Sequence, residues 1–131
     1  MINGNAAGPL VLVVEDVEET RDAIEELLKV DGYRVDPARN EEDAVSRGRR
    51  EPPNIILVSL GGLDEEVIAT ALRIRAHAEL SESTPVVIFC IESVDQGAEV
   101  EIQNNVYLTR PDNFDQLRSL LGRVLHRLPP E

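Results

Sequence analysis

Asn54-Ile55-Ile56-Leu57-Val58-Ser59-Leu60 is the stretch that decides the fold, and Gly61-Gly62 follows it directly. It contains a short, continuous aliphatic run between two prolines and two glycines, which indicates a β-strand buried on both faces of a sheet. In an open α/β sheet, ligands bind and chemistry takes place at the carboxyl ends of such strands. Ser59 lies at that end of this strand, so it is the first candidate for a functional residue.

Four further segments are typical of strands. Residues 9–14 are a continuous aliphatic run like the central one, and residues 86–91 are fully apolar. Residues 33–37 alternate in polarity, and residues 106–109 form a brief last strand. Segments with apolar residues at helical spacing lie between them, and this alternation predicts a parallel sheet covered on both faces. Proline cannot donate to a neighbouring strand, so Pro37 restricts its strand to an edge. The predicted fold class is therefore α/β, a three-layer α/β/α arrangement with a five-stranded parallel sheet of order 2-1-3-4-5.

The sequence marks some helices more clearly than others. Asn40, followed by three acidic residues, marks a helix start, because its side chain can cap the first turn and the acids favour the positive end of the helix dipole. Residues 64–66 give the same acidic signal. Residues 92–105 are weakly marked, because several β-branched residues and Gly97 disfavour a helix. We therefore expect the fourth helix to be short or irregular.

Composition limits the classes of protein that need be considered. A chain of 131 residues with 42% hydrophobic and 29% charged residues suits one soluble globular domain. The formal net charge of -12 argues against binding of nucleic acid or an anionic membrane. The single cysteine fits a reducing cytoplasm, and no apolar run approaches the roughly 20 residues of a membrane span. We expect residues 1–8 to be a mobile tail, residues 9–128 to form the domain, residues 129–131 to be a tail or the start of a linker, and the location to be cytoplasmic.

Several motifs together resemble the receiver domain of two-component response regulators, the CheY-like family, over residues 10–128. In that family an acidic pair after the first strand holds Mg²⁺, and Glu15-Asp16 matches this pair. The third strand of the family ends in the aspartate that accepts phosphate, and Ser59 occupies the corresponding position. The resemblance implies the same sheet order and a role in a phosphorelay.

The resemblance weakens in the rest of the family's active site. Cys90 stands where the family has a threonine or serine that binds the phosphoryl group, and Arg110 stands where it has a phosphate-binding lysine. Tyr107 retains the aromatic character of the family's switch residue. Together with the serine at position 59, these departures predict a degenerate variant, a pseudoreceiver that lacks the phosphoacceptor aspartate.

The departures also affect the expected metal site. An aspartyl phosphate forms when a carboxylate attacks phosphorus while Mg²⁺ and a cationic side chain neutralise the developing charge. Ser59 is neutral, and neither His77 nor His126 lies near it in the predicted topology to act as a base. Because Mg²⁺ favours an octahedral set of oxygen ligands, Glu15 and Asp16 alone are expected to form a weak or vestigial site. No other cofactor and no enzymatic activity are expected.

Arg110 yields a specific hypothesis. Its guanidinium offers a fork of donors that fits a carboxylate pair, so we expect it to bond Glu15 or Asp16 and to occupy the space where a metal would lie. The alternative is that the side chain points to solvent, as arginine side chains commonly do.

Three other candidates each have a structural and a functional interpretation. Ser59 is expected to be a small residue that fills the vacated pocket, the alternatives being a serine nucleophile or a site for a Ser/Thr kinase. Cys90 is expected to be a buried, small apolar residue, the alternative being a redox sensor. Tyr107 is expected to have a packing or fixed interface role, the alternative being rotation as a switch.

The expected function is a receiver-like signalling module of a two-component system that is not phosphorylated on aspartate and acts through protein–protein interaction. The expected partners are a histidine kinase or an output domain. The expected interaction surface is the face of the fourth helix, fifth strand and fifth helix, which includes Tyr107, and a homodimer through the same face is a possible further contact. One alternative is a phosphotransfer-active receiver whose acceptor is Asp16 or Glu15. Another is a small-ligand site of the flavodoxin kind, which the absence of a phosphate cradle at the strand ends disfavours.

Overall fold

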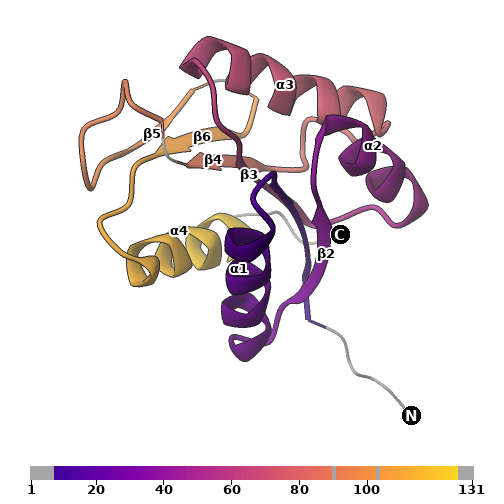
Figure 1. Cartoon of the computed structure of the whole chain (residues 1–131), viewed down its shortest axis with the longest axis horizontal. Helices are drawn as coiled ribbons and strands as arrows, with labels where there is room; N and C mark the ends of the chain where they lie inside the picture. The colour runs from indigo at the N-terminus through magenta and orange to yellow at the C-terminus, as the bar shows by residue number, and fades with distance from the viewer. Residues whose placement is uncertain (1–7, 90, 103, 127–131) are drawn as a thin grey trace.

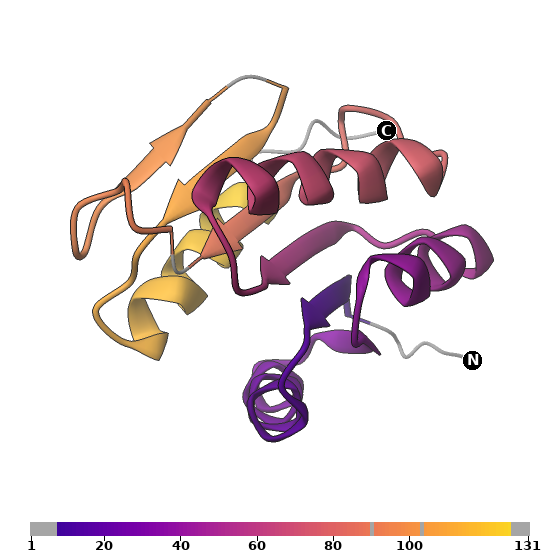
Figure 2. The same ribbon diagram turned by 45° about the horizontal axis from the view of Figure 1, so that its top comes forward.

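A six-stranded sheet between two layers of helices forms the fold of the protein (Figure 1). The computed structural model describes residues 8–89, 91–102 and 104–126. Helices α1 and α4 cover one face of the sheet, and α2 and α3 cover the other (Figures 1 and 2). The elements within the described residues are β1 (Leu10–Glu15), α1 (Glu18–Val30), β2 (Arg34–Ala38), α2 (Glu41–Arg50), β3 (Ile55–Ser59), α3 (Asp64–His77), β4 (Val86–Phe89), β5 (Glu99–Glu101), β6 (Val106–Thr109) and α4 (Phe114–His126).

The strand order is β2-β1-β3-β4-β6-β5. The first five strands in this order are parallel, and β6 is the predicted fifth strand. They therefore follow the predicted order 2-1-3-4-5, and the predicted fold class is confirmed. β2 lies at one edge of the sheet, with Pro37 opposite Val13 of β1, as the missing proline N–H requires. The other edge differs from the prediction, because β5 adds a sixth strand that is antiparallel to β6.

The central strands supply the core on both faces of the sheet. Side chains of successive strand residues point to opposite faces, so each strand contributes to two hydrophobic clusters. In β1, Val11 and Val13 pack with α1 and α4, whereas Leu12 and Val14 pack with α2 and α3. All four side chains are fully buried, which accounts for the continuous aliphatic character of the strand.

The predicted fourth helix is wrong for the described part of residues 92–105. Residues 99–101 form strand β5, and no residue from 91 to 102 or from 104 to 105 is helical. Glu99, Val100, Glu101 and Ile102 alternate between polar and β-branched side chains, a pattern that favours a strand over a helix. β5 pairs with β6 over three residues, so a β-hairpin occupies the place of the expected helix (Figure 2).

Three residues with positive φ angles shape this hairpin. Asn104 and Asn105, at φ angles of 60° and 62°, form the turn before β6, and asparagine tolerates this conformation better than most residues. Gly97, with φ of 82°, precedes β5, and its N–H donates to the carbonyl of Arg110 at 2.6 Å. A Cβ atom at Gly97 would lie 2.8 Å from a carboxylate oxygen of Asp112, so only glycine fits there without displacement.

Arg75 fastens the hairpin turn to α3. It is 4% exposed, and its Nη1 atom donates to the carbonyl oxygens of Thr84 at 3.0 Å and Asn104 at 2.7 Å. Burial lowers the pKa of this guanidinium, since the low-dielectric surroundings disfavour its charge. The side chain therefore satisfies two loop carbonyls that come from segments 20 residues apart in the chain.

We predict that Arg75→Ala lowers the free energy of unfolding by about 2 kcal/mol, because it removes two hydrogen bonds donated by a charged group. Urea denaturation measures this change. The matched control is Arg73→Ala on the same helix, which breaks an exposed ion pair to Glu41 and is expected to cost less than about 1 kcal/mol. Equal effects of the two substitutions would contradict the role assigned to Arg75.

Candidate functional site

The candidate site lies at the carboxyl ends of the two central strands. β1 and β3 are parallel neighbours, and their register pairs Glu15 directly with Ser59. Each is the last residue of its strand, so the first member of the predicted acidic pair lies beside the serine at the phosphoacceptor-equivalent position. The structure thus brings these two predicted site residues together.

A buried hydrogen bond joins the two side chains. The Ser59 hydroxyl donates to Oε1 of Glu15 at 2.6 Å, and the backbone N–H of Val17 donates to Oε2 of Glu15 at 3.1 Å. Glu15 is 4% exposed and Ser59 is 8% exposed. Each carboxylate oxygen therefore already accepts a hydrogen bond inside the protein, as a buried charged group requires.

This bond corrects one sequence-based inference about Ser59. We expected no base near the serine, because both histidines lie elsewhere, but the Glu15 carboxylate accepts its hydrogen bond. The arrangement does not make Ser59 an accessible nucleophile, because both side chains are buried and a substrate would have to displace the bond to reach the hydroxyl. The bond instead fixes the position of the Glu15 side chain.

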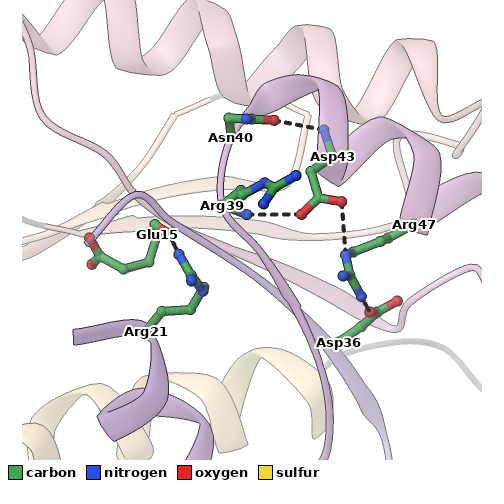
Figure 3. Close-up of polar contacts among 7 residues, drawn as sticks. All are labelled: Glu15, Arg21, Asp36, Arg39, Asn40, Asp43 and Arg47. Atoms are coloured by element: carbon green, nitrogen blue, oxygen red, sulfur yellow. Dashed lines mark hydrogen bonds and ion pairs between the residues drawn. The ribbon is translucent and has the colours of Figure 1, made fainter. Parts of the chain in front are cut away.

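The second acidic residue has a different environment. Asp16 is exposed, whereas the neighbouring Glu15 side chain points into the protein. The guanidinium of Arg21 donates to the backbone carbonyl of Glu15 at 2.9 Å and holds the start of the β1–α1 connection (Figure 3). The predicted acidic pair is therefore split between one internal and one surface carboxylate.

The β2–α2 connection carries a polar network in which the charged side chains pair with one another. Asn40 accepts the backbone N–H of Asp43 at 2.8 Å, which confirms the predicted helix cap (Figure 3). Arg47 bridges Asp43 at 3.0 Å and Asp36 at 2.7 Å, and these hydrogen bonds help to raise its pKa. This network links β2 to α2 and leaves the Glu15–Ser59 pair undisturbed.

The hypothesis that Arg110 occupies the metal position is wrong. Its Nη1 atom makes a long, 3.5 Å contact to the carbonyl oxygen of Val94, and the side chain forms no ion pair with any residue that the structure describes. The residue is half-buried, so it is partly exposed to solvent, as the alternative interpretation in the sequence analysis supposed. The Arg110 side chain therefore contacts the 91–98 segment.

Asp64 holds a loop near the strand ends, a role that the sequence did not reveal. The sequence indicated only that residues 64–66 begin a helix. The Asp64 carboxylate accepts the backbone N–H groups of Ser93 at 2.7 Å and Glu92 at 3.1 Å, and so holds the turn after β4. The pKa of Asp64 is lowered, chiefly by a hydrogen bond from the Ser93 side chain, and the nearby charge of Arg110 acts in the same direction. The acidic first turn of α3 therefore anchors a loop as well as favouring the helix.

The remaining predicted site residues contribute less to the described geometry. Tyr107 is 5% exposed and packs among the residues between the sheet and the α1–α4 layer, so its predicted switch or interface role stays a prediction. Cys90 lies outside the described residues. Among residues 8–89, 91–102 and 104–126 no group of three or more His, Cys, Asp or Glu side chains is placed to hold a metal ion.

The oxygen atoms present at the strand ends fit Mg²⁺ poorly. The ion requires near-octahedral oxygen ligands and in proteins is commonly held by one or two carboxylates. Here both oxygens of Glu15 are engaged internally, Ser59 supplies a hydroxyl in place of a carboxylate, and Asp16 alone is exposed. An ion at this place would have to share Glu15 with the hydrogen bonds from Ser59 and Val17, and it would receive no carboxylate from position 59.

Comparison with known proteins identifies similar chains. No protein-family model matches this chain. The transcriptional regulatory protein KdpE of Staphylococcus aureus is 28% identical over 120 residues, which cover 90% of this chain and 50% of KdpE. The chain thus spans about half the length of that curated relative.

Two solved structures illustrate the likeness of fold. The receiver domain of a signal transduction histidine kinase from Syntrophus aciditrophicus has a TM-score of 0.69 at 16% identity, covering 95% of each chain. The response regulator TrrA of Thermotoga maritima, solved with Mg²⁺ and beryllofluoride, has a TM-score of 0.66 at 18% identity, covering 88% of this chain and 98% of TrrA. The chain therefore has the CheY-like receiver fold. In the described part of the chain, no helix is long and apolar enough to cross a membrane.

We predict that Ser59→Ala lowers the free energy of unfolding by about 1.5–3 kcal/mol, because the buried Glu15 carboxylate loses a hydrogen-bond donor. A double-mutant cycle with Glu15→Ala, followed by urea denaturation, is expected to give a coupling energy of about 1–2 kcal/mol. Ser46→Ala, an equivalent change at an exposed position of α2, serves as the control and is expected to change stability by less than about 0.5 kcal/mol. Independent effects of the two site substitutions would show that the bond does not contribute.

Proposed function

We propose that this protein is a receiver-type module of two-component signalling that acts through protein–protein interaction and does not use an aspartyl phosphate. The observation that carries this proposal is the buried hydrogen bond from Ser59 to Glu15. The residue at the end of the central strand is a neutral serine, and its hydroxyl is committed to the carboxylate that would otherwise face a metal ion.

The chemistry of phosphotransfer supports the proposal. A carboxylate must attack phosphorus, and Mg²⁺ must neutralise charge on the transferred group. Ser59 provides no carboxylate, and the engaged state of Glu15 leaves Asp16 as the one exposed carboxylate of the acidic pair. We accordingly propose that Mg²⁺ binds weakly or not at all and that the chain is not an enzyme.

The similar proteins support the signalling assignment. KdpE is a transcriptional regulatory protein, and the similar receiver domain from Syntrophus belongs to a histidine kinase. By this analogy the proposed partners are a histidine kinase or an output domain, in the cytoplasm. Because the chain spans about half of KdpE, the analogy concerns the receiver part of that regulator.

The proposed interaction surface must be revised from the sequence-based one. The expected face included a fourth helix, but the structure has strand β5 there. The corresponding surface consists of β5, β6 and α4, and it presents Val100 and Ile102, which are 45% and 38% exposed. We retain this surface as the proposed contact for a partner or for a second copy of the chain.

The test of the proposed function is incubation of the protein with acetyl phosphate and Mg²⁺, followed by intact-mass spectrometry. We expect no gain in mass, because no accessible carboxylate stands beside a preformed metal site. The matched comparison is Ser59→Asp, which places a carboxylate at the phosphoacceptor-equivalent position and removes the hydrogen bond that the serine donates to Glu15. A labile gain of one phosphoryl group in the variant alone would assign the loss of phosphotransfer to position 59.

A labile phosphoryl group on the native protein would instead support the alternative, a phosphotransfer-active receiver. Repeating the reaction with Asp16→Asn and Glu15→Gln would then identify the acceptor, since only loss of the reacting carboxylate abolishes the adduct. We expect Asp16 to be the more reactive of the two in that case, because it is exposed and Glu15 is not.

A further inference from the structure

A pocket of about 430 Å³ lies between the carboxyl ends of β4 and β6, the 91–98 segment and the start of α4. Its volume falls within the range of roughly 300–1,000 Å³ that is usual for small-molecule sites. It also lies at the end of the sheet where ligands bind in open α/β folds. The pocket is next to the Ser59–Glu15 pair in the fold but is not lined by either residue.

The walls of this pocket are apolar and aromatic. Phe89 and Phe114 are the two phenylalanines of the chain, and both line it together with Pro111 and Leu117. The two phenylalanine side chains are only half-buried, although each also packs against the core between the sheet and the α1–α4 layer. In a chain with 3% aromatic residues, two half-covered phenyl rings at one pocket form a surface suited to an apolar group.

Two opposite charges lie on the same pocket. Arg110 and Glu92 both line it, and neither side chain forms an ion pair with any described residue. Among the described residues, the Arg110 guanidinium makes one hydrogen bond, the long contact to the carbonyl of Val94 at 3.5 Å. Because the guanidinium has five N–H donors and makes this one long contact, it retains donors for a ligand carboxylate, and Glu92 is exposed and retains its acceptor oxygens.

We propose that this pocket binds a free α-amino acid with an apolar side chain. The carboxylate of the ligand would accept hydrogen bonds from Arg110, its ammonium group would face Glu92, and its side chain would lie against Phe89 and Phe114. A ligand with only a carboxylate would meet repulsion from Glu92, and one with only an ammonium group would meet repulsion from Arg110. A zwitterion with an apolar body satisfies both charges and the aromatic walls.

The proposal goes beyond the proposed function, because it names a small molecule as an input to the domain. It does not depend on whether the chain accepts a phosphoryl group, since the test measures binding without phosphate or Mg²⁺. The pocket touches the first turn of α4, so an occupied site would adjoin the surface proposed for partner proteins.

The test is a two-dimensional ¹H–¹⁵N NMR titration of the whole chain with L-phenylalanine and L-leucine. We expect saturable shifts at the backbone amides of the pocket residues. N-acetyl-L-phenylalanine lacks the ammonium group and resembles the carboxyl-terminal residue of a partner protein. L-phenylalanine amide lacks the carboxylate. Each of these is expected to bind at least about tenfold more weakly than L-phenylalanine, because it loses one charged contact.

Two pairs of variants complete the test. Arg110→Gln and Glu92→Gln are each expected to weaken binding of L-phenylalanine at least about tenfold. The same chemical changes at exposed positions of α2, Arg50→Gln and Glu42→Gln, are the controls and are expected to leave binding unchanged. If Arg110→Gln does not fold, the exposed Glu92→Gln variant decides alone.

Three outcomes would overturn the proposal. One is the absence of saturable shifts with either amino acid up to about 10 mM. The second is equal binding of L-phenylalanine and the two analogues that lack a charge. The third is unchanged binding by Glu92→Gln. None of these results would bear on phosphorylation, so failure of the ligand site can be told apart from failure of the proposed signalling function.

Discussion

Parallel pairing of β1 with β3 is the constraint on which the rest of the structure depends. Both strands are buried on both faces, so their register is fixed by the two hydrophobic clusters that they share. That register places Glu15 beside Ser59 at the end of the sheet. A one-residue slip would separate the carboxylate from its donor and would also move every aliphatic side chain of the strand to the opposite face. The chemistry at the strand ends is therefore inseparable from the packing of the core.

The Ser59–Glu15 bond shows how the ends of two adjacent parallel strands can accommodate a buried carboxylate. With an aspartate at position 59, two carboxylates would lie at adjacent strand ends and would repel each other unless a cation stood between them. Serine removes that repulsion and supplies a donor to Glu15. With serine at this position, an internal hydrogen bond satisfies Glu15 at the end of the sheet.

The sequence predicted those features that depend on a long and continuous pattern. The aliphatic strands, their order, the edge position of Pro37 and the Asn40 cap all agree with the structure. The β5–β6 hairpin was missed because β5 has only three residues, too few for its alternation to outweigh the expectation of a helix between parallel strands. The signal was nevertheless present in the two asparagines before β6, which adopt positive φ angles.

The orientation of Arg110 could not be predicted in the same way, because it depends on the path of the 91–98 segment. That path follows from Gly97, whose N–H bonds the Arg110 carbonyl, and from Asp64, which holds the turn after β4. Both are contacts between segments far apart in the sequence, and neither produces a periodic pattern. The side chain that the sequence assigned to the strand ends therefore turns to the adjoining pocket.

The partners of the other arginines show how Arg110 differs from them. Several exposed arginines bridge neighbouring elements through carboxylates, as Arg73 does from α3 to α2, Arg118 from α4 to the end of α1 and Arg123 from α4 to β5. Buried Arg75 instead donates to two loop carbonyls. These hydrogen bonds satisfy its guanidinium without a carboxylate partner. Arg110 belongs to neither group, although the chain has 25 Asp and Glu residues and only 13 Lys and Arg residues. In so acidic a protein, a half-buried guanidinium that forms no ion pair with any described residue is the side chain best placed to receive an anionic group from outside the fold.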